Sequence, residues 1–527
     1  MKKVLTVALV LVLLILCASA FSDTEKKSGL FTYKLKGNGT AIITGFDWKS
    51  NGNQDIYIPR MIDGYNVTEI GAYAFSDKNL SEEYDWWNVG DSLMGESVNV
   101  IIPDTVTVIG EKAFFRTRIK SVPIPTSVKL IEAGAFAGCF ALKSHLVDKG
   151  NETYTTINGI LYNKKTKELV SFARDSWYSD KKIEIPNGIV SIGDYAFYGF
   201  VLECGIVFPD SLRSIGKSAF SYAIVGGNTE IEGAKKKLFS FNKVTEIRDY
   251  AFANVKMDGL FDFNNSQIET IGNHAFEDVC ITHEADFDIS FSNKESYKSI
   301  LDIVFPSSLK KLGEGAFSCF YRDTYNWRME DDRRIDIDDG NIIMNLDFSN
   351  TKITTIPDNA FRGFGFSSLA SHPELPEVIL PNSLEYIGKR AFCGIRHKRI
   401  RIKIPSSVQI IDNEAFYYSR IDLSFEDEAK LTTIGDKAFY DCDIKAENDT
   451  IVLPNSLKAI GDMAFVKLQY ISKIVIPSSV TKLGDTICDR SGIVLLVEPE
   501  SYAALYASEN GYTTMDIGGE DTSWLDD

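Results

Sequence analysis

The chain has 527 residues, of which 44% are hydrophobic and 24% charged, so it carries enough apolar material for a folded core. Its formal net charge of −17, from 56 basic and 73 acidic residues, argues against nucleic acid or an anionic membrane as the main partner. After the first twenty residues, no stretch approaches the ~18 continuous apolar residues that a membrane-spanning helix needs.

The N-terminus has the pattern of a secretory signal peptide. Lys2 and Lys3 precede the apolar stretch VLTVALVLVLLIL, and Ala18-Ser19-Ala20 offers a small-residue cleavage site. We therefore expect residues 1–20 to be removed and the mature protein to be secreted or held at the cell surface. Lipidation at Cys17 is an open alternative, although Leu16 stands where a small residue is expected.

A motif of the form I-G-x-x-A-F recurs along the chain. The shortest intervals between its phenylalanines are 22 to 26 residues, so the repeat unit is about 23 residues long. Longer intervals contain insertions or a degenerate unit, and Cys488 replaces the phenylalanine in a fourteenth unit. One such unit cannot bury its apolar face alone, so stacked units forming a solenoid are expected. The motif phenylalanines are Phe75, Phe114, Phe136, Phe197, Phe220, Phe252, Phe276, Phe317, Phe361, Phe392, Phe416, Phe439 and Phe465.

Each unit combines a short strand with a compact second half. In KIVIPSS, Ile474 and Ile476 alternate with Val475, which predicts a strand with the isoleucines inward and Val475 outward. Pro477 ends the strand because proline cannot donate to a sheet ladder. Apolar residues then recur at spacings of three and four, which favours a short helical or 3₁₀ segment. The predicted fold is an α/β repeat solenoid with a parallel β-sheet on its concave face, helical segments behind it and the phenylalanines as a spine.

The full pattern x-I-x-I-P-x-S-V-x-x-I-G-x-x-A-F-x-x-C resembles the BspA-like leucine-rich-repeat proteins of bacterial and protist surfaces. The resemblance implies a leucine-rich-repeat solenoid of about 14 units with insertions over residues 56–492. Residues 21–55 look like the family's N-terminal β-hairpin cap, 151–173 like its inserted β-hairpin, and 493–527 like a C-terminal cap with an acidic tail. Arg248 and Pro357 replace the repeat glycine, which leaves the local curvature open.

The cysteines do not form a recognisable metal or redox motif. Seven remain after cleavage at Ala20, none in a C-x-x-C pair. Five of them follow an Ala-Phe pair within one to four residues, which indicates buried thiols at a recurrent structural position; an extracellular disulfide framework is the alternative. These five are Cys139, Cys280, Cys319, Cys393 and Cys442.

No catalytic or nucleotide-binding motif is present, so we expect neither enzymatic activity nor a cofactor. The five histidines are scattered through different units. The acidic stretch DDRRIDIDDGN, at 331–341, resembles a calcium loop, but its glycine comes one place too early for an EF-hand and the closing glutamate is missing. We interpret it as a solvated acidic insertion and assign no metal ligands.

Two features are candidate contacts for a partner. Trp86 and Trp87 lie next to each other in an insertion, where they either anchor a protein or glycan partner or cover the insertion itself. The second feature is the outward residue two places before each strand-ending proline. Its valines and isoleucines reflect either strand propensity or an exposed apolar stripe that marks an interaction site. These outward residues are Ile101, Glu184, Val207, Val304, Ile379, Lys403, Val452 and Val475.

The sequence therefore favours an exported, non-enzymatic interaction protein. The family resemblance implies adhesion to a host matrix protein, a cell-surface protein or a surface glycan, with the concave sheet as the contact surface. A structural envelope-associated spacer without a dedicated ligand is the main alternative, and a hydrolase with its site in an insertion is the third. The ligand, the oligomeric state and the mode of surface retention do not follow from the sequence.

Overall fold

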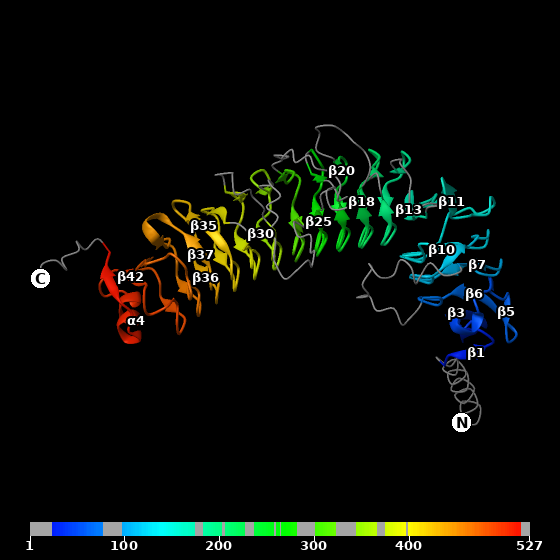
Figure 1. Cartoon of the computed structure of the whole chain (residues 1–527), viewed down its shortest axis with the longest axis horizontal. Helices are drawn as coiled ribbons and strands as arrows, with labels where there is room; N and C mark the ends of the chain where they lie inside the picture. Colours follow the sequence, from blue (N-terminus) through cyan, green and yellow to red (C-terminus); the bar gives the residue numbers. More distant parts are fainter. Residues whose placement is uncertain are drawn as a thin grey trace, which may run out of the picture. The chain divides into compact units, whose positions relative to one another are not determined.

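The computed structural model describes residues 24–76, 97–173, 183–202, 206–226, 237–257, 260–263, 265–281, 301–322, 344–365, 375–396 and 399–517. The chain forms two compact units: unit 1 contains residues 1–179, 186–201 and 215–223, and unit 2 contains 180–185, 202–214 and 224–527. In each unit, short strands from successive repeats pair in parallel, as in a β-solenoid (Figure 1). The expected signal peptide, residues 1–20 with Cys17, lies outside the described residues.

Unit 1 begins with antiparallel strands. β1 (Lys26–Ser28) pairs with β2 (Phe31–Leu35), β2 pairs with β3 (Thr40–Phe46), and β3 then pairs in parallel with β6 (Tyr65–Ile70). A second antiparallel set within 151–173 consists of β11, β12 and β13. Its last strand, β13, pairs in parallel with β15 of the next repeat. The remaining elements are α2 (Trp48–Asn51), β4 (Ile56–Tyr57), β5 (Met61–Ile62), β7 (Val98–Ile101), β8 (Val108–Ile109), β9 (Ile119–Ser121), β10 (Leu130–Ile131), β11 (Tyr154–Ile157), β12 (Ile160–Asn163), β13 (Glu168–Ser171) and β15 (Ser191–Ile192).

Unit 2 carries three rows of parallel strands, with β16 (Val201–Leu202) and β18 (Ser214–Ile215) where the chain passes between the units. One row holds the strands at the place that precedes the proline in the repeat pattern, whether or not the individual repeat has that proline; these are here called the pre-proline strands. They are β14 (Ile183–Glu184), β17 (Ile206–Val207), β20 (Lys237–Ser240), β23 (Leu260–Asp262), β26 (Leu301–Val304), β29 (Met344–Asp347), β31 (Glu377–Ile379), β33 (Ile400–Ile404), β35 (Arg420–Phe425), β38 (Thr450–Val452), β40 (Lys473–Ile476) and β42 (Val494–Val497), followed by β43 (Thr514–Asp516). β37 (Asp443–Lys445) follows an Ala-Phe pair instead and pairs with the first half of β35.

The other two rows consist of shorter strands. The second row holds the residues just before the repeat glycine: β21 (Glu246–Ile247), β24 (Thr270–Ile271), β27 (Lys311–Leu312), β30 (Thr355–Ile356), β32 (Tyr386–Ile387), β34 (Ile410–Ile411), β36 (Thr433–Ile434), β39 (Ala459–Ile460) and β41 (Lys482–Leu483). The third row follows the Ala-Phe pair: β19 (Ile224–Val225), β22 (Lys256–Met257), β25 (Cys280–Ile281) and β28 (Tyr321–Arg322). The helices within the described residues of unit 2 are η3 (Glu447–Asp449) and α4 (Tyr502–Asn510).

The Ala-Phe segments form turns in the described residues, where the sequence predicted short helices. The backbone is left-handed two residues before and two residues after the motif phenylalanine, as at Tyr195 (φ 61°) and Gly199 (φ 73°) around Phe197. Two left-handed residues so close together exclude a right-handed helix. The N–H groups of these three residues donate to carbonyl oxygens of the next coil, at 2.9, 2.9 and 2.7 Å for Tyr195, Gly199 and Phe197. Hydrogen bonds between coils therefore replace those of a helix.

The motif phenylalanines form the predicted spine within each unit. Phe197 stacks on Phe220 with ring centres 4.8 Å apart, and in unit 2 the ring of Phe416 lies 5.2 Å from that of Phe439. Phe172, at the end of the inserted strands, stacks on Phe197 at 4.9 Å and so supplies the spine residue that the long interval lacked. Strand residues alternate with this core, since the inward isoleucines of β33 are fully buried while its intervening residues are exposed.

Polar side chains join each coil to the next. The residue after the repeat glycine accepts a hydrogen bond from the following coil, as when Asp462 N–H donates to Asp436 Oδ1 at 2.8 Å. The serine two places after the strand-ending proline donates back, as Ser479 Oγ does to Leu457 O at 2.7 Å. A β-carbon at Gly461 would lie 2.4 Å from the backbone nitrogen of Asp436, so the coils approach too closely there for any other residue.

Candidate interaction surface

The predicted outward residues lie on the pre-proline strands, with their side chains away from the core. Ile101, Val207, Ile379 and Val452 are exposed by 38%, 46%, 37% and 62%, which places all four side chains at the surface. Glu184 and Lys403 are also exposed, whereas Val304 and Val475 are half-buried. Trp86 and Trp87 lie outside the described residues, as does the acidic stretch at 331–341.

Strand pairing shows which of these residues are neighbours and adds others that the sequence analysis missed. Tyr57 also stands two places before a proline and was overlooked. The other added residues lie on strands that have no proline two places further on, so only the pairing register identifies them. They are Asp347, Ser424, Leu496 and Met515. The neighbouring outward pairs are Tyr57 with Ile101, Glu184 with Val207, Val304 with Asp347, Asp347 with Ile379, Lys403 with Ser424, Val452 with Val475, Val475 with Leu496, and Leu496 with Met515.

The outward residues do not form one apolar stripe. Asp347 stands between Val304 and Ile379, and the pair of Lys403 with Ser424 is polar. An unbroken apolar row occurs on β38, β40, β42 and β43. We call this the C-terminal apolar row; it consists of Val452, Val475, Leu496 and Met515.

Alternating charges flank the outward positions on neighbouring strands. Arg401 of β33 pairs in register with Glu377 on one side and with Asp422 on the other, and Asp422 pairs with Lys445. Opposite charges on adjacent strands offset one another across a sheet. This part of the face therefore has a mixed charge and carries less apolar surface than the C-terminal apolar row.

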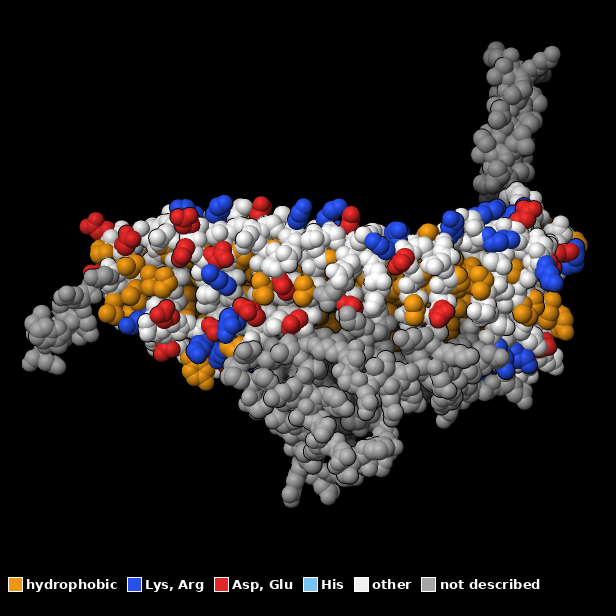
Figure 2. Space-filling model, turned by 90° about the horizontal axis from the view of Figure 1, so that it is seen from above, with side chains coloured by type: hydrophobic (Ala, Val, Ile, Leu, Met, Phe, Trp, Pro, Cys, Tyr) orange, Lys and Arg blue, Asp and Glu red, His pale blue; other side chains and the backbone are white. Residues whose placement is uncertain are grey.

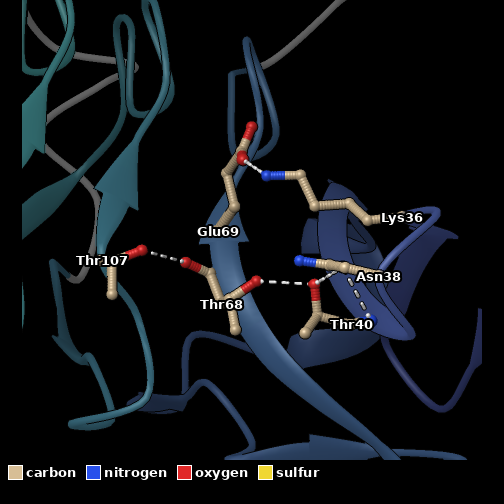
Figure 3. Close-up of polar contacts among 6 residues, drawn as sticks. All are labelled: Lys36, Asn38, Thr40, Thr68, Glu69 and Thr107. Carbon is tan, nitrogen blue, oxygen red and sulfur yellow. Dashed lines mark hydrogen bonds and ion pairs between the residues drawn. The ribbon is translucent and has the colours of Figure 1, made fainter.

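A column of threonines in unit 1 is a second polar feature, shown in Figure 3. Thr68 Oγ donates to Thr40 Oγ at 3.0 Å, and Thr107 Oγ donates to Thr68 O at 3.2 Å. Lys36 forms an ion pair with Glu69 beside them. Because these groups already bond to one another, the column ties the first strands of unit 1 together and offers little to a ligand.

A cluster of aromatic and basic side chains lies on the turns of unit 1. The ammonium of Lys112 is 4.5 Å from the ring centre of Tyr195, 5.2 Å from that of Phe115 and 5.5 Å from that of Tyr73. Such distances give a favourable cation–π interaction. Lys112 is only 6% exposed, so the cluster is packed as part of the structure.

The described cysteines are free thiols, four of them buried and two partly exposed. Cys139 Sγ donates to Phe114 O at 2.9 Å, and burial raises the pKa of Cys139 to about 12. Burial likewise raises the pKa of the partly exposed Cys319 and Cys393. A thiol must be deprotonated to act as a nucleophile or metal ligand, so these groups are poorly suited to either task at neutral pH.

The described residues contain neither a cluster suited to a metal ion nor a helix suited to a membrane. No group of three or more His, Cys, Asp or Glu side chains in this part of the chain is placed to hold a metal ion. None of its helices has the length and apolar character that crossing a bilayer requires.

Comparison with known proteins identifies related repeats. A family model described as the BspA type leucine rich repeat region matches in six copies, within residues 94–172, 171–240, 234–327, 339–448 and 364–494. Comparison with curated proteins gives no match.

Three solved structures illustrate the similarity. A leucine-rich repeat protein from Bacteroides ovatus is 20% identical with a TM-score of 0.38, covering 94% of this chain and 100% of that one. A leucine rich cell surface protein from Faecalibacterium prausnitzii is 15% identical with a TM-score of 0.29, covering 96% and 97%. The pneumococcal vaccine antigen PcpA is 13% identical with a TM-score of 0.29, covering 94% and 98%.

Proposed function

Because the chain belongs to the BspA-type leucine-rich repeat family, we propose that it is a non-enzymatic binding protein that is exported and attaches to a protein on a cell or matrix surface. Export is supported by the signal-peptide pattern of residues 1–20. The repeat architecture supports a binding role, since solenoids present extended surfaces to their partners.

The observation that carries this proposal is the C-terminal apolar row. Val452 is exposed by 62% and Met515 by 36%, and their strands place Val475 and Leu496 between them. Branched residues favour strands in general. Four apolar side chains in adjacent outward positions, however, also form a continuous apolar surface whose exposure to water is unfavourable. A protein partner that covers this row gains the free energy of burying it.

The test compares binding of the mature protein and its variants to immobilised fibronectin, fibrinogen and whole cells. Leu496→Lys places a charge in the middle of the row and is expected to weaken binding by about tenfold or more, which corresponds to ~1.4 kcal/mol. Ile379→Lys is the matched control, because Ile379 has Asp347 as its neighbour and lies outside the row. Its affinity should stay close to that of the wild type.

Three results would redirect the proposal. Absence of binding to every surface at micromolar concentration would favour a structural spacer over an adhesive protein. Binding that survives Leu496→Lys but is lost when Trp86 and Trp87 are both changed to Ala would move the contact to the tryptophan pair. Hydrolytic turnover that disappears on changing acidic residues of an insertion would favour the hydrolase.

A further inference from the structure

The sheet that carries the C-terminal apolar row has an open edge. Its strand order is β38-β40-β42-β43, and among the described residues β43 pairs with β42 alone. All three residues of β43 are exposed. An edge strand of this kind presents unpaired N–H and C=O groups that can template a further strand.

The hydrogen bonds of β43 show which groups face the open edge. Leu495 N–H donates to Thr513 O at 2.9 Å, and Ile517 N–H donates to Val497 O at 3.2 Å. Backbone groups of alternate residues point to opposite sides of a strand, so Met515 faces β42 together with Thr513 and Ile517. Thr514 and Asp516 therefore direct an N–H and a C=O each toward the open edge.

The segment of chain that ends in this edge strand is strongly acidic. After the last repeat glycine, Gly484, residues 485–517 contain six acidic residues and one basic residue, a net charge of −6 + 1 = −5. No ion pair involves any of these residues within the described part of the chain. Figure 2 shows hydrophobic and acidic side chains close together at the end of unit 2 near the C-terminus. The acidic residues are Asp485, Asp489, Glu498, Glu500, Glu509 and Asp516, and the basic residue is Arg490.

We propose that the open edge of β43 binds an extended, basic segment of a partner protein by strand addition. The backbone of that segment hydrogen-bonds to Thr514 and Asp516, and its apolar residues, at alternate positions, extend the C-terminal apolar row beyond Met515. Its lysines or arginines lie among the acidic residues of 485–517. This inference rests on the proposed binding function and adds the chemical class of the partner segment to it.

The same charge argues against a second copy of the chain at this edge. Two β43 strands that paired with each other would bring two segments of net charge −5 together. Like charges that face each other across an interface oppose association. A basic segment instead meets the complementary charge.

The test uses a fluorescent peptide that alternates lysine and valine, with binding to the full mature protein followed by anisotropy. Thr514→Pro removes an N–H that faces the open edge, while every hydrogen bond between β42 and β43 is kept. The expected result is a loss of affinity of about tenfold or more with an unchanged melting temperature. The control peptide carries N-methyl groups on alternate residues. It keeps the charge and the side chains but lacks the backbone N–H groups that strand addition needs, so it should not bind.

Several results would overturn the inference. Equal affinity for the wild type and Thr514→Pro, or for the plain and N-methylated peptides, would mean that the peptide binds by charge alone. Binding only after deletion of residues 518–527 would mean that the chain's own tail occupies the edge. A dimer in analytical ultracentrifugation that Thr514→Pro abolishes would identify a second copy as the occupant.

The test also separates this inference from the proposed function. If fibronectin, fibrinogen or cells bind through the Leu496 surface while the peptide does not bind, the proposed function stands and strand addition fails. If the peptide binds at the edge while no protein or cell surface does, strand addition stands and the adhesive function fails.

Discussion

The ring of Phe136 packs edge-on against the imidazole of His145, with ring centres 5.1 Å apart and planes at 67°. The pair ends a run of stacked rings that begins at Phe75 and continues through Phe114. His145 is 1% exposed, and neither ring nitrogen has a hydrogen-bond partner among the described residues. A neutral imidazole carries one N–H, so unit 1 buries an unmatched donor beside its spine.

This burial makes the stability of unit 1 depend on pH. Burial lowers the pKa of His145 to about 3, against about 6.5 in an unfolded chain. Between these values the unfolded state binds a proton that the folded state does not. The free energy of unfolding therefore falls as the pH drops below about 6.5 and levels off above it. Going from pH 7 to pH 5 should cost about 2 kcal/mol, measured by urea unfolding at both values.

His145→Phe and His145→Leu are the controls for this effect. Both remove the titrating group and leave an apolar side chain next to Phe136. The difference in unfolding free energy between pH 7 and pH 5 should shrink by about 2 kcal/mol in each variant relative to the wild type. The same pH dependence in all three proteins would contradict a neutral buried imidazole.

The stacked spine predicts a large cost for removing one of its rings. Phe197 is fully buried between Phe172 and Phe220, at centre distances of 4.9 and 4.8 Å. Phe197→Ala should lower the free energy of unfolding by about 3–5 kcal/mol, since truncating a core phenylalanine loses its burial and leaves a cavity. Tyr470→Ala, at a residue that is 70% exposed, is the control and should change little. A loss below about 1 kcal/mol for Phe197→Ala would count against the spine.

The polar ladder between coils predicts a difference between two substitutions at one residue. Asp436 Oδ1 accepts the N–H of Asp462 at 2.8 Å, and Asn413 Oδ1 accepts the N–H of Asp436 at 2.7 Å. Asp436→Ala should cost about 1–2 kcal/mol, because the Asp462 N–H loses its acceptor. Asp436→Asn should keep most of the stability, since Asn413 already performs this role in the preceding coil. Equal unfolding free energies for both variants in urea would contradict the ladder.

The inside of the solenoid was predictable from the sequence, because the same apolar residues recur at the same places in every coil. Phe197 and the inward isoleucines such as Ile474 lie where the repeat pattern placed them. The turns were not predictable in this way. The left-handed residues include Tyr195, Glu414 and Lys437, residue types that do not indicate a positive φ as glycine does. In addition, the spacing of alanine and phenylalanine in the motif also fits a helix.

The outward surface was predictable only in part. Ile101 and Val452 could be found because a proline follows them at a fixed distance. Leu496 and Met515 could not, because no such proline follows their strands and only the pairing register places them beside Val475. The apolar row thus depends on strand alignment between coils, which a repeat pattern interrupted by insertions does not specify.

A buried thiol between coils leads to the last prediction. Cys442 Sγ donates to Phe416 O at 2.8 Å, and one coil earlier Ser419 Oγ donates to Phe392 O at 2.7 Å. A serine hydroxyl therefore already makes the equivalent hydrogen bond in the preceding coil. Cys442→Ser should keep the unfolding free energy within about 0.5 kcal/mol, whereas Cys442→Ala should lose about 1 kcal/mol as the carbonyl of Phe416 loses its donor.

The same thiol should resist alkylation in the folded protein. Cys442 is fully buried, and that burial raises its pKa, so little thiolate forms at neutral or mildly alkaline pH. Iodoacetamide at pH 8 should label Cys319 and Cys393, which are partly exposed, before it labels Cys442. Unfolding in urea should expose all three to the reagent. Mass spectrometry of the peptides measures the order, and rapid labelling of Cys442 in the folded protein would show that the coils around Phe416 open more readily than their packing implies.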